Sequence, residues 1–299
     1  MSINDNIRDI IEDSTYIDII DKIINEDKDY GRGNYSKGEK ISIEYGSLGS
    51  INTIYGDTLS RIISFMGYDV TREYLLNYND VNDIKKELDK YRVNFDIFID
   101  KDGLCDKGIV DMTLNILKKN NLCYIDNDNL CLKVNDKNII LVDSDGLYTD
   151  FLMRIAYYID RLNRGYDILI DVIKNSDIDN ISYIKYVIKC IGYDEKKINY
   201  KVIDNSISDD IDYNFDVNFL RYYVLSKLDY DIAMNRINYI SSINIRLYKL
   251  LKENNNINSG TIDCDSAYTI LNKLVEFERV VRNSSVGKLD IICNYLYEL

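Results

Sequence analysis

The stretch ISIEYGSLGSINTIYGDTLSRIISFMGYDVTREYLLNYND, residues 41–80, decides the fold of this chain. Apolar and polar residues alternate from Ile41 to Tyr45, which predicts a strand, and a Gly/Ser loop follows it. Gly67 then separates a predicted helix from a second strand, and the helix carries its apolar residues at Ile54, Leu59, Ile62, Ile63 and Met66. Strand, glycine-rich turn, helix and strand in this order predict the opening βαβ unit of a nucleotide-binding parallel sheet.

Length and composition predict a soluble globular protein with two domains. The 299 residues can bury a substantial core, and 29% of them are charged while 46% are hydrophobic. No apolar run approaches the roughly eighteen residues that cross a membrane, and residues 1–14 are acidic and polar, unlike a signal peptide. We therefore expect a cytoplasmic protein without a membrane partner.

The chain contains no His, Pro, Trp or Gln. Ile, Asn, Asp, Lys and Tyr are abundant instead, which strong AT bias in the gene explains. Without histidine the chain lacks the ordinary general base near neutral pH, the imidazole metal ligand and every Ser-His or Cys-His dyad. The sequence therefore predicts no metal site and offers no candidate for a catalytic residue.

The net charge limits the binding partners that we expect, and the spacing of the cysteines indicates their redox state. The formal net charge of -13 argues against nucleic-acid binding by bulk electrostatics, so DNA is not expected, although a local basic face stays open. The cysteines form no C-x-x-C pair, and in a cytosolic chain they predict reduced core thiols rather than disulfides or metal ligands. They are Cys105, Cys123, Cys131, Cys190, Cys264 and Cys293.

The quoted stretch also resembles the bacterial type of arginyl-tRNA synthetase. In that family a strand ending in Glu-x-x-Ser runs into the His-x-Gly-His signature, and a helix holding Gly-Asp precedes a Gly-Tyr-Asp-Val-x-Arg-Glu run. Glu44, Ser47, Gly56, Asp57 and residues 67–74 fall on this pattern in order. Both signature histidines are absent, and the segment between Glu44 and Gly56 is shorter than in the family.

A second match covers SDGLYTDFLMRIAYYIDRLNRGYD, residues 144–167. It resembles the family's Ser-Asp-Gly-x-Tyr-Thr-Tyr-Phe segment and the Arg-Gly-Phe-Asp turn that follows. The family's pocket Tyr and Asp, four residues apart on one helical face, correspond here to Asp150 and Arg154. A guanidinium substrate needs a fixed carboxylate, because a buried unpaired charge costs several kcal/mol. Arg154 would repel such a substrate.

The remaining matches concern the loops that approach ATP and the C-terminal helices. The loop at residues 174–177 lacks the family's Gly and His, and KVIDNSISDDIDYNF, residues 201–215, stands where the family has its Lys-Met-Ser-Lys loop. The family's lysines there stabilise the transition state, whereas carboxylates would repel ATP. VNFLRYYVL, residues 217–225, resembles the opening of the family's helical anticodon-binding domain.

The resemblance implies an α/β fold with a class I synthetase Rossmann-type parallel sheet and a C-terminal all-helical domain. We expect a short N-terminal helical segment at residues 1–40, which would be a remnant of the tRNA-contacting domain. A catalytic-core-like domain would occupy residues 41–215, with an insertion around residues 93–142. A truncated helical anticodon-binding-like domain would occupy residues 216–299.

The resemblance also nominates ligand-binding residues in the core. Glu44 matches the carboxylate that the family uses on substrate arginine, although a polar strand end is the alternative. Asn77 matches one member of the family's Asn-Asp turn, and Tyr157 contacts either substrate or the core. Gly46 and Gly49, in a glycine-containing stretch that extends to Gly56, are candidates for nucleotide binding, or they form a shortened turn. ATP is the cofactor that the resemblance implies.

Basic residues of the C-terminal helices are candidates for tRNA binding. They are Arg221, Arg236, Arg246 and Lys249. The alternative is a solvated helix face. The many tyrosines allow either base stacking or half-buried aromatic packing.

Two classes of function therefore stay open. The first, which we favour, is a degenerate arginyl-tRNA synthetase-like protein that no longer activates arginine and acts by binding tRNA or a protein partner. The second is an active arginine-tRNA ligase whose catalytic groups are rebuilt from other residues. Loss of one preorganised donor typically costs about two to three orders of magnitude in rate, and here both signature motifs are missing. A gene product without a selected role is the third alternative.

Overall fold

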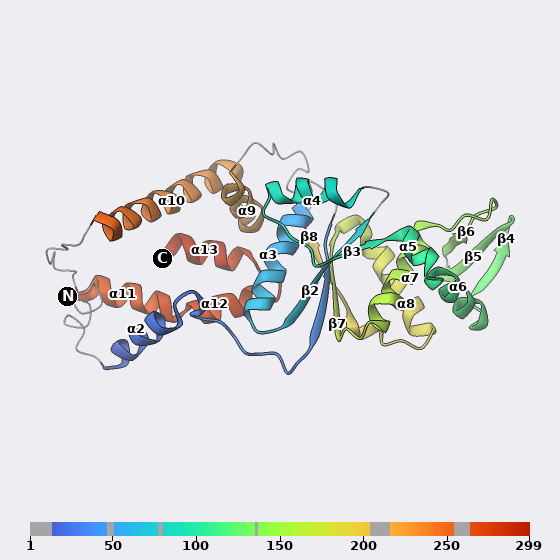
Figure 1. Ribbon diagram of the computed structural model, residues 1–299, viewed down its shortest axis with the longest axis horizontal. Coiled ribbons are helices and arrows are strands. Elements are labelled where there is room, and N and C mark those ends of the chain that lie inside the picture. The colour runs from blue at the N-terminus through green and yellow to red at the C-terminus, as the bar shows by residue number, and fades with distance from the viewer. Residues whose placement is uncertain (1–13, 47–50, 77–79, 135–136, 204–215, 254–263) are drawn as a thin grey trace. The chain divides into compact units, whose positions relative to one another are not determined.

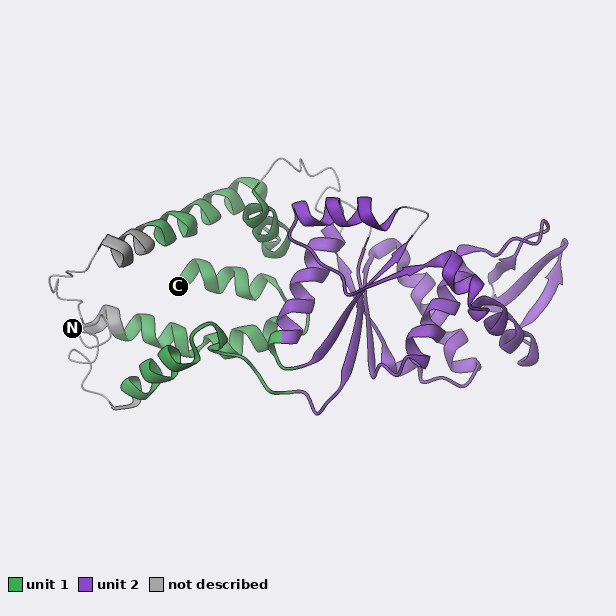
Figure 2. Ribbon diagram, viewed as in Figure 1, with its two compact units in different colours: residues 1–35, 65–67, 213–299 green, residues 36–64, 68–212 purple. Residues whose placement is uncertain are grey.

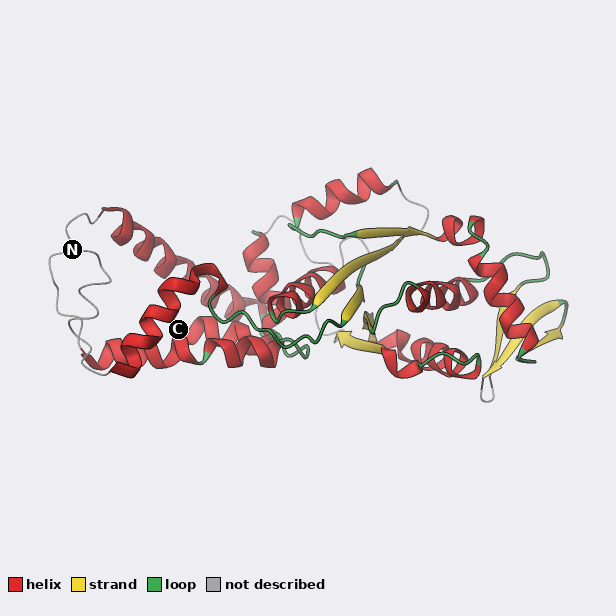
Figure 3. Ribbon diagram, turned by 60° about the horizontal axis from the view of Figure 1, so that its bottom comes forward, coloured by secondary structure: helices red, strands yellow, loops and turns green. Residues whose placement is uncertain are grey.

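The computed structural model describes residues 14–46, 51–76, 80–134, 137–203, 216–253 and 264–299. The chain divides into two units (Figure 2). The sheet unit comprises residues 36–64 and 68–212, and the helical unit comprises residues 1–35, 65–67 and 213–299. Figure 3 shows strands in the sheet unit, whereas helices and loops make up the described part of the helical unit. The three-domain division at residues 40 and 215 stays a prediction.

A five-stranded parallel sheet runs through the sheet unit in the order β3-β2-β1-β7-β8 (Figure 1). Parallel sheets covered by helices bury their strands on both faces, and residues 41–44 of β1 are all buried, although Ser42 and Glu44 are polar. This sheet confirms the predicted α/β fold. Its strands are β1 (Lys40–Glu44), β2 (Asp69–Leu76), β3 (Ile97–Asp100), β7 (Ile168–Lys174) and β8 (Ile198–Ile203).

Helices connect these strands and cover both faces of the sheet, with α3 on one face and α7 and α8 on the other (Figure 1). From β1 the chain builds toward β2 and β3, whereas β7 and β8 lie on the opposite side of β1, so the strand order reverses between β1 and β7. In open α/β sheets, ligands bind at the carboxyl ends of the strands that flank such a reversal. The helices are α3 (Ile51–Phe65), α4 (Val81–Lys90), α7 (Asp150–Asn163) and α8 (Ile178–Cys190).

Gly56 lies inside α3, where it is needed for packing. A Cβ at this position would overlap the side chain of Tyr45, which is fully buried. The glycine therefore allows α3 to approach the end of β1 closely.

The predicted insertion around residues 93–142 begins with β3 of the main sheet and then contains two helices and a small antiparallel sheet in the order β4-β5-β6. Its leucines and valines continue the main core, because Val110, Leu117, Leu132 and Leu141 belong to the same buried cluster as the apolar face of α7. The elements are α5 (Lys101–Asp106), α6 (Ile109–Lys119), β4 (Cys123–Asp126), β5 (Asn129–Val134) and β6 (Lys137–Val142). Short 3-10 turns η2 (Asn175–Asp177) and η3 (Glu195–Lys197) precede α8 and β8.

The helical unit joins an N-terminal helix to the C-terminal helices. Ile20 and Leu271 form a small buried cluster, and the Tyr30 and Phe277 rings stack with centroids 6.2 Å apart. The elements are α2 (Ser14–Glu26), η1 (Asp27–Asp29), α9 (Val217–Ser226), α10 (Tyr230–Glu253), α11 (Cys264–Val275), α12 (Phe277–Ser284) and α13 (Asp290–Glu298). Of the helices described, none is both long and apolar enough to cross a membrane.

Candidate functional site

Three carboxylates lie side by side in the parallel sheet. Glu44 of β1 is in register with Glu73 of β2 on one side and with Asp171 of β7 on the other. Residues in register on neighbouring strands point to the same face of a sheet, so the three carboxylates form a row. All three are buried. A buried carboxylate without a partner is strongly unfavourable, so this row needs compensating charges.

Arginines at and just after α7 supply these charges. Arg154 and Arg161 lie on one helical face because they are seven residues apart, and Arg164 follows the end of the helix. Each arginine is paired with one carboxylate of the row, so the charges of the row are balanced, and Arg164 also pairs with Asp160 at 2.9 Å. The pairs are Arg161 Nη1 with Asp171 Oδ1 at 2.5 Å, Arg164 Nη2 with Glu73 Oε2 at 2.6 Å, and Arg154 Nη1 with Glu44 Oε2 at 3.4 Å.

The three arginines differ in how firmly they are held. Arg161 is fully buried and also donates to the hydroxyl and the carbonyl of Ser42, at 2.9 and 3.0 Å. Arg164 donates through both terminal nitrogens to the two oxygens of Glu73. Arg154 makes the longest of the three pairs, and 31% of its side chain remains exposed. The Arg164 side chain is 27% exposed, but of the three arginines Arg154 is the one that lines the pocket described below.

Two buried tyrosines of α7 complete the network. The hydroxyl of Tyr157 donates to Glu73 Oε2 at 3.1 Å, and the hydroxyl of Tyr158 donates to Asp171. Burial, as the main cause, raises the pKa of both phenols well above the ordinary value, so they stay protonated donors. Both side chains are fully buried. The substrate contact suggested for Tyr157 remains a prediction, and the contact observed is with the network.

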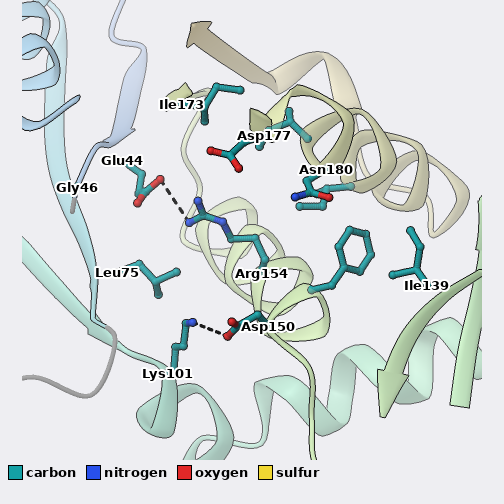
Figure 4. A pocket seen from close by; sticks show the side chains of 13 residues that line it. Glu44, Gly46, Leu75, Lys101, Ile139, Asp150, Arg154, Ile173, Asp177 and Asn180 are labelled. Atoms are coloured by element: carbon teal, nitrogen blue, oxygen red, sulfur yellow. Dashed lines mark hydrogen bonds and ion pairs between the residues drawn. The ribbon is translucent and has the colours of Figure 1, made fainter. Parts of the chain in front are cut away.

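A pocket of about 480 Å³ opens at the carboxyl ends of β1 and β7, where the strand order reverses. Its volume lies within the ~300–1,000 Å³ that small-molecule sites occupy. Figure 4 shows Arg154 pointing from α7 toward Glu44, with Asp177 and Asn180 on another side of the pocket. The apolar part of the wall consists of Leu75, Ile139, Phe151, Ile173, Ile181 and Ile184.

The charges that line the pocket are largely paired with one another. Lys101 Nζ lies 2.7 Å from Asp150 Oδ1, and Arg154 pairs with Glu44 (Figure 4). Asp177 is partly buried and has no ion-pair partner among the residues that the structure describes. The pocket therefore presents two neutralised pairs and one further carboxylate.

Burial and pairing shift the pKa values of Glu44 and Arg154 in opposite directions. Burial raises the pKa of Glu44, and the attraction of Arg154 offsets only part of this effect. Burial, the largest single effect, would lower the pKa of Arg154, but Glu44 together with the neighbouring Asp171 and tyrosines outweighs it and raises that pKa. Arg154 is thus a permanent cation fixed at the pocket wall, and Glu44 depends on it for charge compensation.

Sequence comparison supplies the decisive relationship. No protein-family model matches the chain. The arginine-tRNA ligase of Listeria monocytogenes serotype 4a is 24% identical over 64% of this chain, and arginine-tRNA ligase 2 of Bacillus thuringiensis is 22% identical over 96% of it. The chain is arginyl-tRNA synthetase-like. It spans about half (49%) of the Listeria ligase and 74% of the Bacillus ligase.

The fold agrees with this arginyl-tRNA synthetase-like character. The solved structure of Thermus thermophilus arginyl-tRNA synthetase superposes with a TM-score of 0.69 and 10% sequence identity, and the match covers all of this chain and 76% of the Thermus chain. At this identity the likeness concerns the fold alone. The α/β core followed by helices thus matches the architecture that the resemblance implied.

Of the two glycines nominated for nucleotide binding, one lies at the pocket and the other lies outside the described residues. Gly46 lines the pocket, and a Cβ there would come within 2.8 Å of the Tyr74 ring, so packing also requires a glycine. Gly49 and the substrate-binding candidate Asn77 lie outside the described residues. The nucleotide contact of Gly46 therefore stays a prediction.

The basic residues nominated for tRNA binding lie on α9 and α10 of the helical unit. Arg236 donates to Asn294 Oδ1 at 3.0 Å and stacks over the Tyr297 ring at 4.4 Å. Arg221 is partly buried, and the side chains of Arg246 and Lys249 lie outside the described part of the chain. Their role in binding remains a prediction.

Sequence reasoning missed the pairing partners within the carboxylate row. Glu73, Asp171, Arg161 and Arg164 were not nominated as site residues, although Asp171 interrupts the otherwise apolar segment ILIDVI of β7. That interruption was the available signal, because a carboxylate in a doubly covered strand needs a buried cation. No group of three potential ligands that could hold a metal ion occurs among the described residues.

Proposed function

We propose that this arginyl-tRNA synthetase-like chain is a cytoplasmic pseudoenzyme that does not activate arginine and acts by binding tRNA or a protein partner. The observation that carries the proposal is the ion pair between Arg154 and Glu44 in the pocket. Glu44 is the residue that the family resemblance nominates for contact with substrate arginine, and Arg154 stands where the family has its pocket Asp. In this chain the Glu44 carboxylate already has a guanidinium partner.

Electrostatics supports the inability to bind arginine. A substrate guanidinium approaching Glu44 would meet Arg154 at close range, and like charges at such a distance repel strongly in a partly buried site. To bind Glu44, the substrate would have to displace Arg154 from the carboxylate that compensates its charge, which is unfavourable. Asp177, the remaining carboxylate of the pocket, lies after β7 and belongs to a different wall.

The absence of histidine supports the loss of catalysis. Adenylate formation relies on preorganised donors for the developing charge, and each lost donor typically costs about 10²–10³ in rate. The chain has no histidine anywhere. Lys101 and Arg154 are the cations that line the pocket, and both are already paired with carboxylates.

One observation favours the alternative of an active ligase. Two cations line a pocket at the strand reversal, which is where nucleotides bind in open α/β sheets. If the Lys101–Asp150 pair opened, Lys101 could contact an ATP phosphate, since 86% of the Asp150 side chain is exposed and the pair is weakly held. This alternative requires ATP as a cofactor.

Arginine-dependent exchange between ATP and pyrophosphate tests the proposal directly. We expect no exchange above the background without enzyme, together with saturable binding of tRNA in a fluorescence anisotropy titration or of a protein partner. A Lys101→Met variant is the control, because any genuine exchange should fall when the lysine that lines the pocket is removed. Exchange that requires arginine and is lost in Lys101→Met would overturn the proposal in favour of the ligase.

A further inference from the structure

Arg154 differs from the other arginines of the row in what lies around it. Arg161 is enclosed by the sheet and bonded to a backbone carbonyl, so its removal would leave a closed hole. Arg154 lines an existing pocket, and 31% of its side chain is exposed. Its guanidinium therefore occupies space that is continuous with the pocket.

The carboxylate that Arg154 contacts is well placed for cation binding. The Glu44 side chain is 5% exposed and belongs to a strand held on both sides by neighbours, so its position is fixed. Asp177 adds a second carboxylate to the pocket without an ion-pair partner among the described residues. A desolvated, immobile carboxylate gains strongly from a charged donor.

We propose that Arg154 is a specificity-determining residue that fills the cation position of the pocket as an internal ligand, and that shortening it creates a binding site for small guanidinium cations. This inference rests on the proposed function, because it explains why the intact pocket rejects a guanidinium from solution. Glu44 is the group that recognises the cation, and Asp177 raises the local negative potential.

The shape of the cation matters for this site. A guanidinium presents planar, forked N–H donors that match a carboxylate, whereas an ammonium acts as a compact and strongly hydrated charge. The pocket that Arg154 lines also has apolar walls, which include Phe151 and Ile181. A weakly hydrated guanidinium with a short alkyl chain fits the position left by Arg154 better than an alkylammonium does.

Ethylguanidinium is the probe, because Arg154→Ala removes an ethylguanidinium group from the side chain. We expect millimolar ethylguanidinium to raise the melting temperature of Arg154→Ala and to bind it in a calorimetric titration. Binding to the wild-type protein, and to the matched control Glu44→Gln/Arg154→Ala, should be weaker by at least about tenfold. Ethylammonium at the same ionic strength should bind Arg154→Ala more weakly than ethylguanidinium.

Equal effects of ethylguanidinium on the wild-type protein, Arg154→Ala and the double variant would overturn the inference. If Arg154→Ala does not fold, Arg154→Gln replaces it, because glutamine keeps most of the aliphatic stem and removes the charge. No stabilisation of Arg154→Gln would then overturn the inference as well. Failure of the proposed function has a separate readout, since it appears as arginine-dependent pyrophosphate exchange by the wild-type protein.

Discussion

Replacing Arg161 with methionine tests whether the row of carboxylates depends on its arginines. Methionine keeps the length and much of the apolar volume of the side chain but removes the charge and all donors. Asp171 would be left fully buried without its cation, and Ser42 would lose the donors to its hydroxyl and carbonyl. The hydroxyl of Tyr158 would still donate a hydrogen bond to Asp171, but the hydrogen bond from Arg161 would be lost.

The size of the effect follows from the burial of both partners. Arg161 and Asp171 each have 0% side-chain exposure, so solvent cannot replace the lost partner. Removing one member of a buried ion pair costs about 3–5 kcal/mol, against a total stability of about 5–15 kcal/mol. At roughly 2–4 °C per kcal/mol for a domain of this size, a loss near the middle of that range lowers the melting temperature by roughly 8–16 °C.

Urea unfolding followed by circular dichroism, together with thermal melts, measures this loss. The double variant Arg161→Met/Asp171→Asn should recover about 2 kcal/mol of it, because asparagine removes the stranded charge and still accepts from Tyr158. Lys86→Met is the surface control: its partner is Asp83, both side chains are 76% exposed, and the expected change is below about 1 kcal/mol. A loss in Arg161→Met no larger than in Lys86→Met would refute the reasoning.

Three further predictions concern single positions. The pKa of Glu44 is raised in the folded state, so ionisation of Glu44 destabilises the fold as pH rises above the pKa of the unfolded chain, and Arg154→Ala removes the charge that offsets this effect. The melting temperature of Arg154→Ala should therefore fall further below that of the wild type as pH rises from about 5 to about 8. A difference that stays constant over this range would contradict the argument. Gly56→Ala should cost about 1–3 kcal/mol in urea unfolding because the new methyl overlaps Tyr45, and wild-type stability would count against that packing. Burial raises the pKa of Cys293 to about 12, so its thiol should not react with Ellman's reagent in the folded protein at about pH 8. Wild type and Cys293→Ser should therefore give the same number of reactive thiols in buffer, and the wild type should give one more in urea. A difference already present in buffer would show that the Cys293 thiolate is accessible in the folded protein.

Local sequence patterns were sufficient to predict the core of the fold. The alternation from Ile41 to Tyr45 and the helical spacing after it predicted β1 and α3, and both are present. The alternation predicted the strand correctly but indicated only one buried face, whereas Ser42 and Glu44 are buried too, because helices cover both faces of the sheet. The small sheet at residues 123–142 also lies within the predicted insertion.

Part of the candidate site could be predicted from the sequence as well. The resemblance singled out Glu44 and Arg154 separately, one as a substrate carboxylate and the other as a charge that repels the substrate. Their contact could not be predicted, because it joins residues 110 positions apart through the packing of α7 on β1. Tyr157 was open between ligand and core, and the structure places its hydroxyl on Glu73.

The sequence by itself determined the fold class, the relationship to arginyl-tRNA synthetases and the absence of histidine chemistry. These properties depend on residue identity and on short-range periodicity, which can be read along the chain. Only the tertiary structure decided that Glu44, Glu73 and Asp171 form one row and that each faces its own arginine. The physical reason is that strand register and helix packing bring distant residues together, and a buried charge is stabilised by the partner that it meets there.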